Sequence, residues 1–167
     1  MKHLLWIVVL TIYTCSLNGQ PNNVLLTKIT DNIKCTDQKD APIIVTSLTE
    51  LNTLLLPNTT QETILKNVDL NTENLVFLCF SYGGPGICGK AYFEYFLVNA
   101  NNSQVIKVKI YDALNDKPMY YNSVVLKIPK SYPLKNVSLS KEYITYKIKT
   151  TTDMDSICDR LNRQFKP

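Results

Sequence analysis

The chain has a single histidine and a single tryptophan among its 167 residues. His3 and Trp6 lie in a segment with the layout of an export signal, in which Lys2 gives a positively charged start. The apolar run that follows is too short to cross a membrane. We therefore expect residues 1–19 to be a signal peptide and residues 20–167 to form a single domain.

The mature domain would contain no imidazole group, and this absence excludes several classes of function. Ser-His-Asp and Cys-His catalysis, zinc sites with histidine ligands and pH switching by histidine all require that group. We expect no cofactor and no metal, since the cysteines also lack Cys-x-x-Cys spacing. The formal net charge of +4 is too small to indicate a nucleic-acid partner.

Four cysteines follow the leader: Cys35, Cys79, Cys88 and Cys158. An even number in an exported chain indicates two disulfides, for which three connectivities exist. We favour Cys79–Cys88, which flank a tight Gly/Pro loop, and Cys35–Cys158, which would tie the N-terminal segment to a C-terminal helix. A fifth cysteine, Cys15, lies in the leader and suggests an alternative, a lipoprotein with a lipid anchor at Cys15, although the residue before it fits a lipobox poorly.

Apolar periodicity predicts an α+β fold, with a mainly antiparallel β-sheet of five to seven strands packed by one or two helices. A Ser47–Glu50 capping box should start one helix, which stops before Pro57. A short helix or turn is expected near 64–65, and an amphipathic C-terminal helix from about Thr152. Strands or extended segments are expected at 22–33, 43–45, 75–80, 91–98, 104–111, 120–128 and 143–148.

One hairpin can be placed in register. If Asn101–Asn102 forms a two-residue turn, Phe93 pairs with Ile110 on an apolar face. Glu94 then meets Lys109 on the opposite face, where an ion pair is expected. A slip of one residue would mix the two faces, so the turn chemistry and the apolar pattern favour the same register.

Two motifs suggest catalytic or nucleotide chemistry, but each has a simpler interpretation. Residues 84–90 match G-x-x-x-x-G-K, yet Ala91 replaces the Ser or Thr of a phosphate loop and β-formers follow instead of a helix. Glu94 could act as the general acid of a glycan hydrolase, with Asp112 or Asp69 as a second carboxylate. No spacing selects that second acid, and pairing with a lysine explains Glu94 structurally.

Lysines and tyrosines on the later strands indicate a recognition surface. Residues 105–150 hold nine lysines and three acids, whereas residues 20–104 hold five lysines and eight acids. For the distribution of charge we favour the simpler explanation, solvent-facing lysines that discourage edge pairing. The alternative is a patch for an anionic glycan or membrane surface. The binding surface that we expect consists of the 82–90 loop and the strand residues beside it, namely Tyr82, Lys90, Tyr92, Lys107, Lys109 and Tyr111.

The order of motifs between residues 43 and 129 resembles a known family. It comprises a capped helix at 47–51, Val68-Asp69-Leu70 before an apolar strand, a Gly-Gly turn, an aromatic strand and a closing Lys127-Ile128-Pro129. These features are similar to small exported bacterial domains related to the C-terminal domain of the protease-complex protein PrcB. The chain departs from that family in the residues after the turn and in its cysteines. The resemblance implies non-catalytic association with another extracytoplasmic protein.

Together these features predict a non-enzymatic, extracytoplasmic protein-binding module, such as an accessory or inhibitor of a secreted enzyme. We expect it to be secreted or located in the periplasm or cell envelope, with no transmembrane span. Two alternatives stay open at this point. One is a carboxylate-dependent glycan hydrolase that uses Glu94, and the other is a structural envelope lipoprotein anchored at Cys15.

Overall fold

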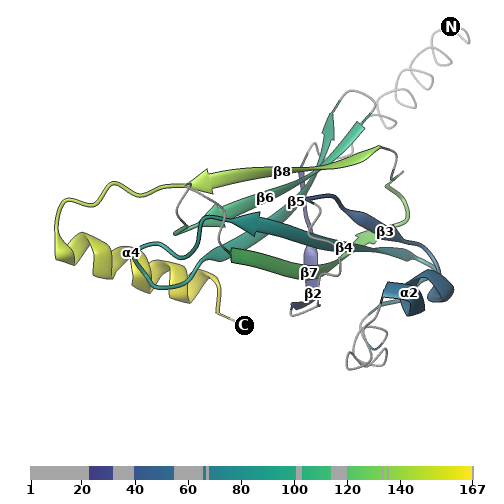
Figure 1. Ribbon diagram of the computed structural model, residues 1–167, viewed down its shortest axis with the longest axis horizontal. Helices are drawn as coiled ribbons and strands as arrows, with labels where there is room; N and C mark the ends of the chain where they lie inside the picture. The colour runs from purple at the N-terminus through teal and green to yellow at the C-terminus, as the bar shows by residue number, and fades with distance from the viewer. Residues whose placement is uncertain are drawn as a thin grey trace, which may run out of the picture.

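The computed structural model describes residues 23–31, 40–54, 66, 68–100, 103–113, 120–132, 134 and 136–166. The described residues form eight strands and two helices, which confirms the predicted α+β class (Figure 1). The strands are β1 (Asn23–Leu25), β2 (Thr27–Asp31), β3 (Ile43–Val45), β4 (Glu73–Tyr82), β5 (Tyr92–Ala100), β6 (Ser103–Tyr111), β7 (Tyr120–Pro129) and β8 (Val137–Ile144). The helices are α2 (Leu48–Leu54) and α4 (Thr151–Gln164).

The strands form two four-stranded sheets, with the orders β1-β5-β6-β8 and β2-β7-β4-β3. All pairs are antiparallel except β6 and β8, which are parallel. The strand number exceeds the expected five to seven because the predicted arm at 22–33 contains two strands. Leu26 is buried between them, and the chain crosses there from one sheet to the other.

The main core lies between the two sheets, which pack face to face. Alternate residues of each strand point inward, as the period of two in a β-strand requires. Even-numbered positions of β4 and β7 supply one side, and the inward faces of β5 and β6 supply the other. The buried strand residues of this core are Val76, Leu78, Phe80, Tyr95, Leu97, Ile106, Val108, Ile110, Val124, Leu126 and Ile128.

A second, smaller core covers the outer face of the β2-β7-β4-β3 sheet. There Leu51 of α2 packs with Leu75, Phe77 and Val125. Burial on both faces explains why β4 reads as a continuous apolar run. The capping box predicted for α2 is present at its start, where Ser47 Oγ accepts the Glu50 N–H at 3.3 Å.

The predicted hairpin register is confirmed over the whole β5–β6 pair. Phe93 lies opposite Ile110, and Glu94 lies opposite Lys109. The alternating pattern was sufficient here because only one register keeps all the inward-facing positions apolar. The turn residues 101–102 lie outside the described part of the chain.

The strand predicted at 143–148 is wrong in its bounds. β8 spans Val137–Ile144, so the prediction missed its first six residues and continued four residues too far. It ends opposite Tyr111, where its partner β6 also ends, and residues 145–149 pair with no strand in the described part of the chain and form an extended link. The amphipathic helix α4 follows, as predicted. Thr150 caps it, because its side chain accepts the Asp153 N–H while the Asp153 carboxylate accepts the Thr150 N–H.

Several predictions fall on residues that the structure does not describe. These are the signal peptide at 1–19, the lipid anchor at Cys15, the position of Cys35 and the turn near 64–65. Within the described ranges, no helix is long and apolar enough to cross a membrane.

Candidate binding groove

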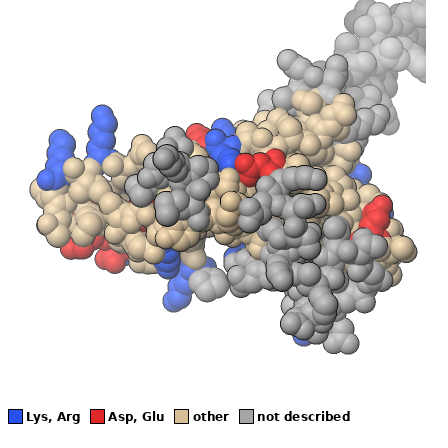
Figure 2. Space-filling model, in the orientation of Figure 1, with Lys and Arg blue, Asp and Glu red and all other residues tan. Residues whose placement is uncertain are grey.

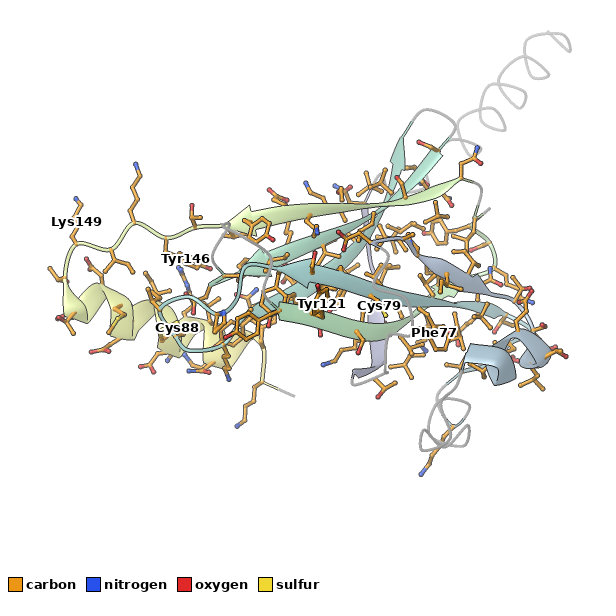
Figure 3. All side chains as sticks on the ribbon, in the orientation of Figure 1. Phe77, Cys79, Cys88, Tyr121, Tyr146 and Lys149 are labelled. Atoms are coloured by element: carbon orange, nitrogen blue, oxygen red, sulfur yellow. A yellow bond between two sulfur atoms is a disulfide. The ribbon has the colours of Figure 1, made fainter. Side chains whose placement is uncertain are left out.

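A disulfide between Cys88 and Cys158 fastens α4 to the loop that precedes β5. This bond corrects both predicted pairings, Cys79–Cys88 and Cys35–Cys158. Cys79 points from β4 toward the outer face of its sheet with Phe77, whereas Cys88 lies beside α4 (Figure 3). Cys79 is also disulfide-bonded, and its partner lies outside the described residues.

Asp112 holds the glycine-rich loop that resembled a phosphate-binding motif. Its carboxylate accepts the Ile87 N–H at 2.8 Å and the Cys88 N–H at 2.6 Å, while its carbonyl oxygen accepts the Gly86 N–H at 2.6 Å. A Cβ atom at Gly86 would lie only 2.5 Å from the Asp112 carboxylate, so this approach requires glycine. The loop amides thus bind a carboxylate of the same chain. A strand and not a helix follows the loop, as the β-forming residues after Ala91 predicted.

The C-terminal end of α4 covers part of the expected binding surface. The Phe165 ring lies 5.3 Å from the centroids of both the Tyr92 and Tyr111 rings. Tyr92 retains only 6% exposure, and its hydroxyl group donates to Asn162 Oδ1 at 2.8 Å. Tyr92 and Tyr111 therefore form a docking platform for the end of the helix, and Tyr92 is buried there, not open on the strand surface as predicted.

Glu94 takes part in the same packing. Its carboxylate accepts the Tyr111 hydroxyl at 2.5 Å and the Gln164 side-chain amide at 3.0 Å. The predicted ion pair with Lys109 is wrong, because the Lys109 ammonium group instead lies over the Phe96 ring at 4.9 Å. Burial is the main reason why the pKa of the Tyr111 phenol lies well above its usual value. The hydrogen bond to Glu94 and the negative charge of that carboxylate raise the pKa further.

The other predicted binding residues lie in three different places. Lys107 is on the outer face of its sheet, paired with Glu142 at 2.8 Å. Tyr82 is half-buried at the end of the main core, with its ring 5.3 Å from that of Phe93, so it does not belong to the outer face. Lys90 is exposed, and its ammonium group lies 4.9 Å above the Tyr92 ring.

Lys90 borders a groove of about 550 Å³ that runs beside the start of β5. We call it the β5 groove. Its walls are residues 90–95, the corner between β1 and β2 at Leu25, Leu26 and Lys28, Asn122 of β7, and residues 164–166 at the end of α4. It lies where the short strands β1 and β2 have ended, so the two sheets leave an open corner at this end of the molecule.

The residues around the β5 groove combine apolar surface with positive charge. Leu25 is 64% exposed at its rim, and Lys28, Lys90 and Lys166 line it. Glu94 is the acidic residue of the lining, and both of its carboxylate oxygens already accept hydrogen bonds. Figure 2 shows both basic and acidic side chains around the end of the molecule that carries α4. The arrangement suits an anionic ligand with apolar parts.

The predicted catalytic partners of Glu94 have structural roles. Asp112 binds the loop amides, and the Asp69 carboxylate accepts the Asn71 N–H and the Thr72 hydroxyl within its own turn. In the described ranges, no group of three or more His, Cys, Asp or Glu side chains is placed to hold a metal ion.

Sequence reasoning singled out Lys90, Tyr92 and Glu94 but missed the other residues that line the β5 groove. Leu25, Lys28, Asn122 and Lys166 come from segments far apart in the chain, and no local pattern brings them together. The apolar pair at 25–26 is the one local feature at this corner, and it does not specify a crossing between sheets.

Comparisons with known proteins add no relative. No protein-family model matches the chain, and no curated protein or solved structure matches it. The resemblance to the PrcB-related domains therefore stays a prediction.

Proposed function

We propose that this chain is a non-enzymatic binding module that acts outside the cytoplasm, as an accessory or inhibitor of a secreted enzyme. The observation that carries the proposal is the β5 groove, which has an exposed apolar rim at Leu25 and a lining that includes the exposed lysines Lys90 and Lys166. An open, partly apolar concavity with a few charged groups is typical of a recognition site.

Its disulfides support the extracytoplasmic part of the proposal. Cys88 and Cys158 are bonded to each other, and Cys79 is bonded as well. Such bonds persist in oxidising compartments and are rare in the cytosol. They leave secretion into the medium and retention in the periplasm as equal alternatives.

The hydrogen bonds of the acidic residues favour binding over hydrolysis. A glycosidase needs two carboxylates that face each other across a cleft. Glu94 is held by Tyr111 and Gln164, and Asp112 is held by the loop amides. No described contact favours the alternative of a structural lipoprotein anchored at Cys15.

A paired affinity purification tests the proposal. The purified protein and its Lys90→Glu/Lys166→Glu variant are immobilised and exposed to the medium and envelope fractions of the producing organism. We expect a secreted protein that the wild type retains and the groove variant loses. The control is Lys147→Glu/Lys149→Glu, which changes the net charge equally at exposed positions of the link before α4. Equal retention by all three proteins would contradict a binding role of the β5 groove.

A further inference from the structure

We infer that the β5 groove accepts an extended, acidic segment of the partner protein, which pairs with the edge of β5 as an added strand. This inference rests on the proposed function and specifies how the partner is bound. Strand addition needs backbone groups that point into the groove and a groove that follows the strand edge. In the β5 groove, charge would then select among the segments that fit.

The backbone of Phe93 points into the groove. The carbonyl oxygen of Tyr95 accepts the Leu26 N–H at 2.8 Å, so Tyr95 directs its backbone groups away from β6. In an antiparallel pair, residues two apart direct their N–H and C=O groups to the same side. Phe93 therefore presents one donor and one acceptor at this edge, where β1 has already ended and no described strand replaces it.

The β5 groove runs along the edge of the strand and not over one face of the sheet. Residues 91–95 all line it, although successive side chains of a strand point to opposite faces. Only a concavity at the edge can touch every residue in such a run. It therefore has the direction that an added strand needs.

The opposite edge of the molecule at this end is closed by side chains. There Lys141 of β8 donates to the Ser81 carbonyl oxygen at 3.1 Å and to Asp40 at 2.9 Å, and Asp40 accepts the Ser81 N–H at 3.0 Å. These contacts bridge the two sheets and satisfy backbone groups at the edge of β4. On the side of the β5 groove, the two sheets are joined by the hydrogen bond that the Asn122 side-chain amide donates to the Tyr95 hydroxyl at 3.0 Å. This bond joins two side chains and uses no backbone group of β5. The β5 edge is thus the more accessible of the two.

Charge selects an acidic segment over a second copy of this chain. A second copy would bring the same lysine-lined edge, and the acid of that lining, Glu94, already accepts a hydrogen bond on each carboxylate oxygen, so the copy offers these lysines no matching charge. A segment with Glu or Asp side chains would meet these ammonium groups favourably. An anionic glycan would satisfy the lysines but has no alternating N–H and C=O groups to match Phe93.

A peptide of alternating Glu and Val residues, labelled with fluorescein, is the probe for a first test by fluorescence anisotropy. We expect saturable binding that weakens about tenfold or more in Lys90→Glu/Lys166→Glu, which corresponds to the loss of two modest charge interactions. The Lys147→Glu/Lys149→Glu variant should bind like the wild type, since Lys149 projects away from the sandwich (Figure 3). A peptide of alternating Lys and Val should not bind. Lack of saturable binding by the acidic peptide would overturn the inference.

N-methylation distinguishes strand addition from simple charge attraction. Methyl groups on the peptide nitrogens that face β5 should abolish binding, whereas methyl groups on the alternate nitrogens should leave it unchanged. In NMR hydrogen exchange, the Phe93 amide should become protected when the peptide binds. The Glu94 amide, which points toward β6, should stay protected throughout and serves as the internal control. Equal binding of both methylated peptides would show that no strand is added.

The two proposals can fail separately. If the affinity purification yields a groove-dependent partner but the methylated peptides bind equally, the proposed function stands and strand addition is wrong. If the acidic peptide adds as a strand but no secreted partner depends on the groove, the β5 groove is a peptide site without the proposed role.

Discussion

The hydroxyl group of Tyr92 donates a hydrogen bond to Oδ1 of Asn162, 70 residues later in the chain. This contact joins the first residue of β5 to the last turn of α4. Together with the Cys88–Cys158 bond and the packing of the Phe165 ring on Tyr92, it fixes the helix against the sheet at several points. Because residues 164–166 form one wall of the β5 groove, the shape of the groove depends on this docking.

Replacing the disulfide tests its contribution to stability. The double variant Cys88→Ser/Cys158→Ser should lower the free energy of unfolding by up to about 4 kcal/mol, since the bond closes a long loop and restricts the unfolded chain. Urea denaturation of the variant and the wild type measures the difference. Ser156→Ala, at an exposed position of α4, is the control. A double variant as stable as the wild type would mean that the bond adds little to the docking of α4.

Phe165→Ala should loosen the end of α4. Its ring is half-buried between two tyrosines, so truncation should cost about 1–3 kcal/mol, less than for a fully buried Phe. Tyr92→Phe keeps the aromatic packing and removes only the hydrogen bond to Asn162, so it should cost about 1 kcal/mol. Chemical denaturation gives both values. An equal loss for the two variants would contradict the assignment of the stacking to Phe165.

The α+β class and the β5–β6 hairpin could be predicted because each depends on local patterns. The alternation of 104–111 and the aromatic run of 91–98 allow one register that keeps a face apolar, and the structure has that register. The predicted capping box of α2 is local in the same way. Division of the arm at Leu26 into two strands was not predicted, because a short apolar pair does not specify which sheet each half joins.

The site was predicted less well than the fold because its contacts join distant parts of the chain. Tyr92 and Tyr111 have the pattern of a solvent-facing strand surface, and an amphipathic helix at the C-terminus is equally evident from sequence. Nothing in either pattern specifies that Phe165 packs on those two tyrosines. The same long-range docking brings Cys158 to Cys88, so the sequence argument for pairing cysteines close in the chain was wrong.

Asp112 should be critical to the loop before β5. Asp112→Ala removes two charge-assisted hydrogen bonds to backbone amides and places alanine at a left-handed position with φ of 51°, so a loss of about 2–4 kcal/mol is expected. Asp112→Asn should cost about half as much, since asparagine keeps one acceptor and tolerates that conformation. Thermal and urea denaturation measure both. Similar losses for the two variants would show that the charge, and not the acceptor or the backbone conformation, stabilises the loop.

Tyr111 should make the stability of the protein fall at alkaline pH. Its burial, together with the adjacent Glu94 carboxylate, raises the pKa of its phenol in the folded state, whereas in the unfolded chain the phenol ionises near pH 10. A raised folded pKa contributes stability below the unfolded pKa, and that contribution is lost as the pH rises above about 10. The free energy of unfolding of the wild type should therefore decline more steeply above pH 10 than that of Tyr111→Phe.

The control is Tyr121→Phe, which removes an exposed phenol from the start of β7, and its free energy of unfolding should decline like that of the wild type. Urea denaturation across this pH range, with tyrosine ionisation followed by ultraviolet absorbance, measures the slopes. Equal slopes for the wild type and Tyr111→Phe would mean that the Tyr111–Glu94 contact does not hold the phenol protonated.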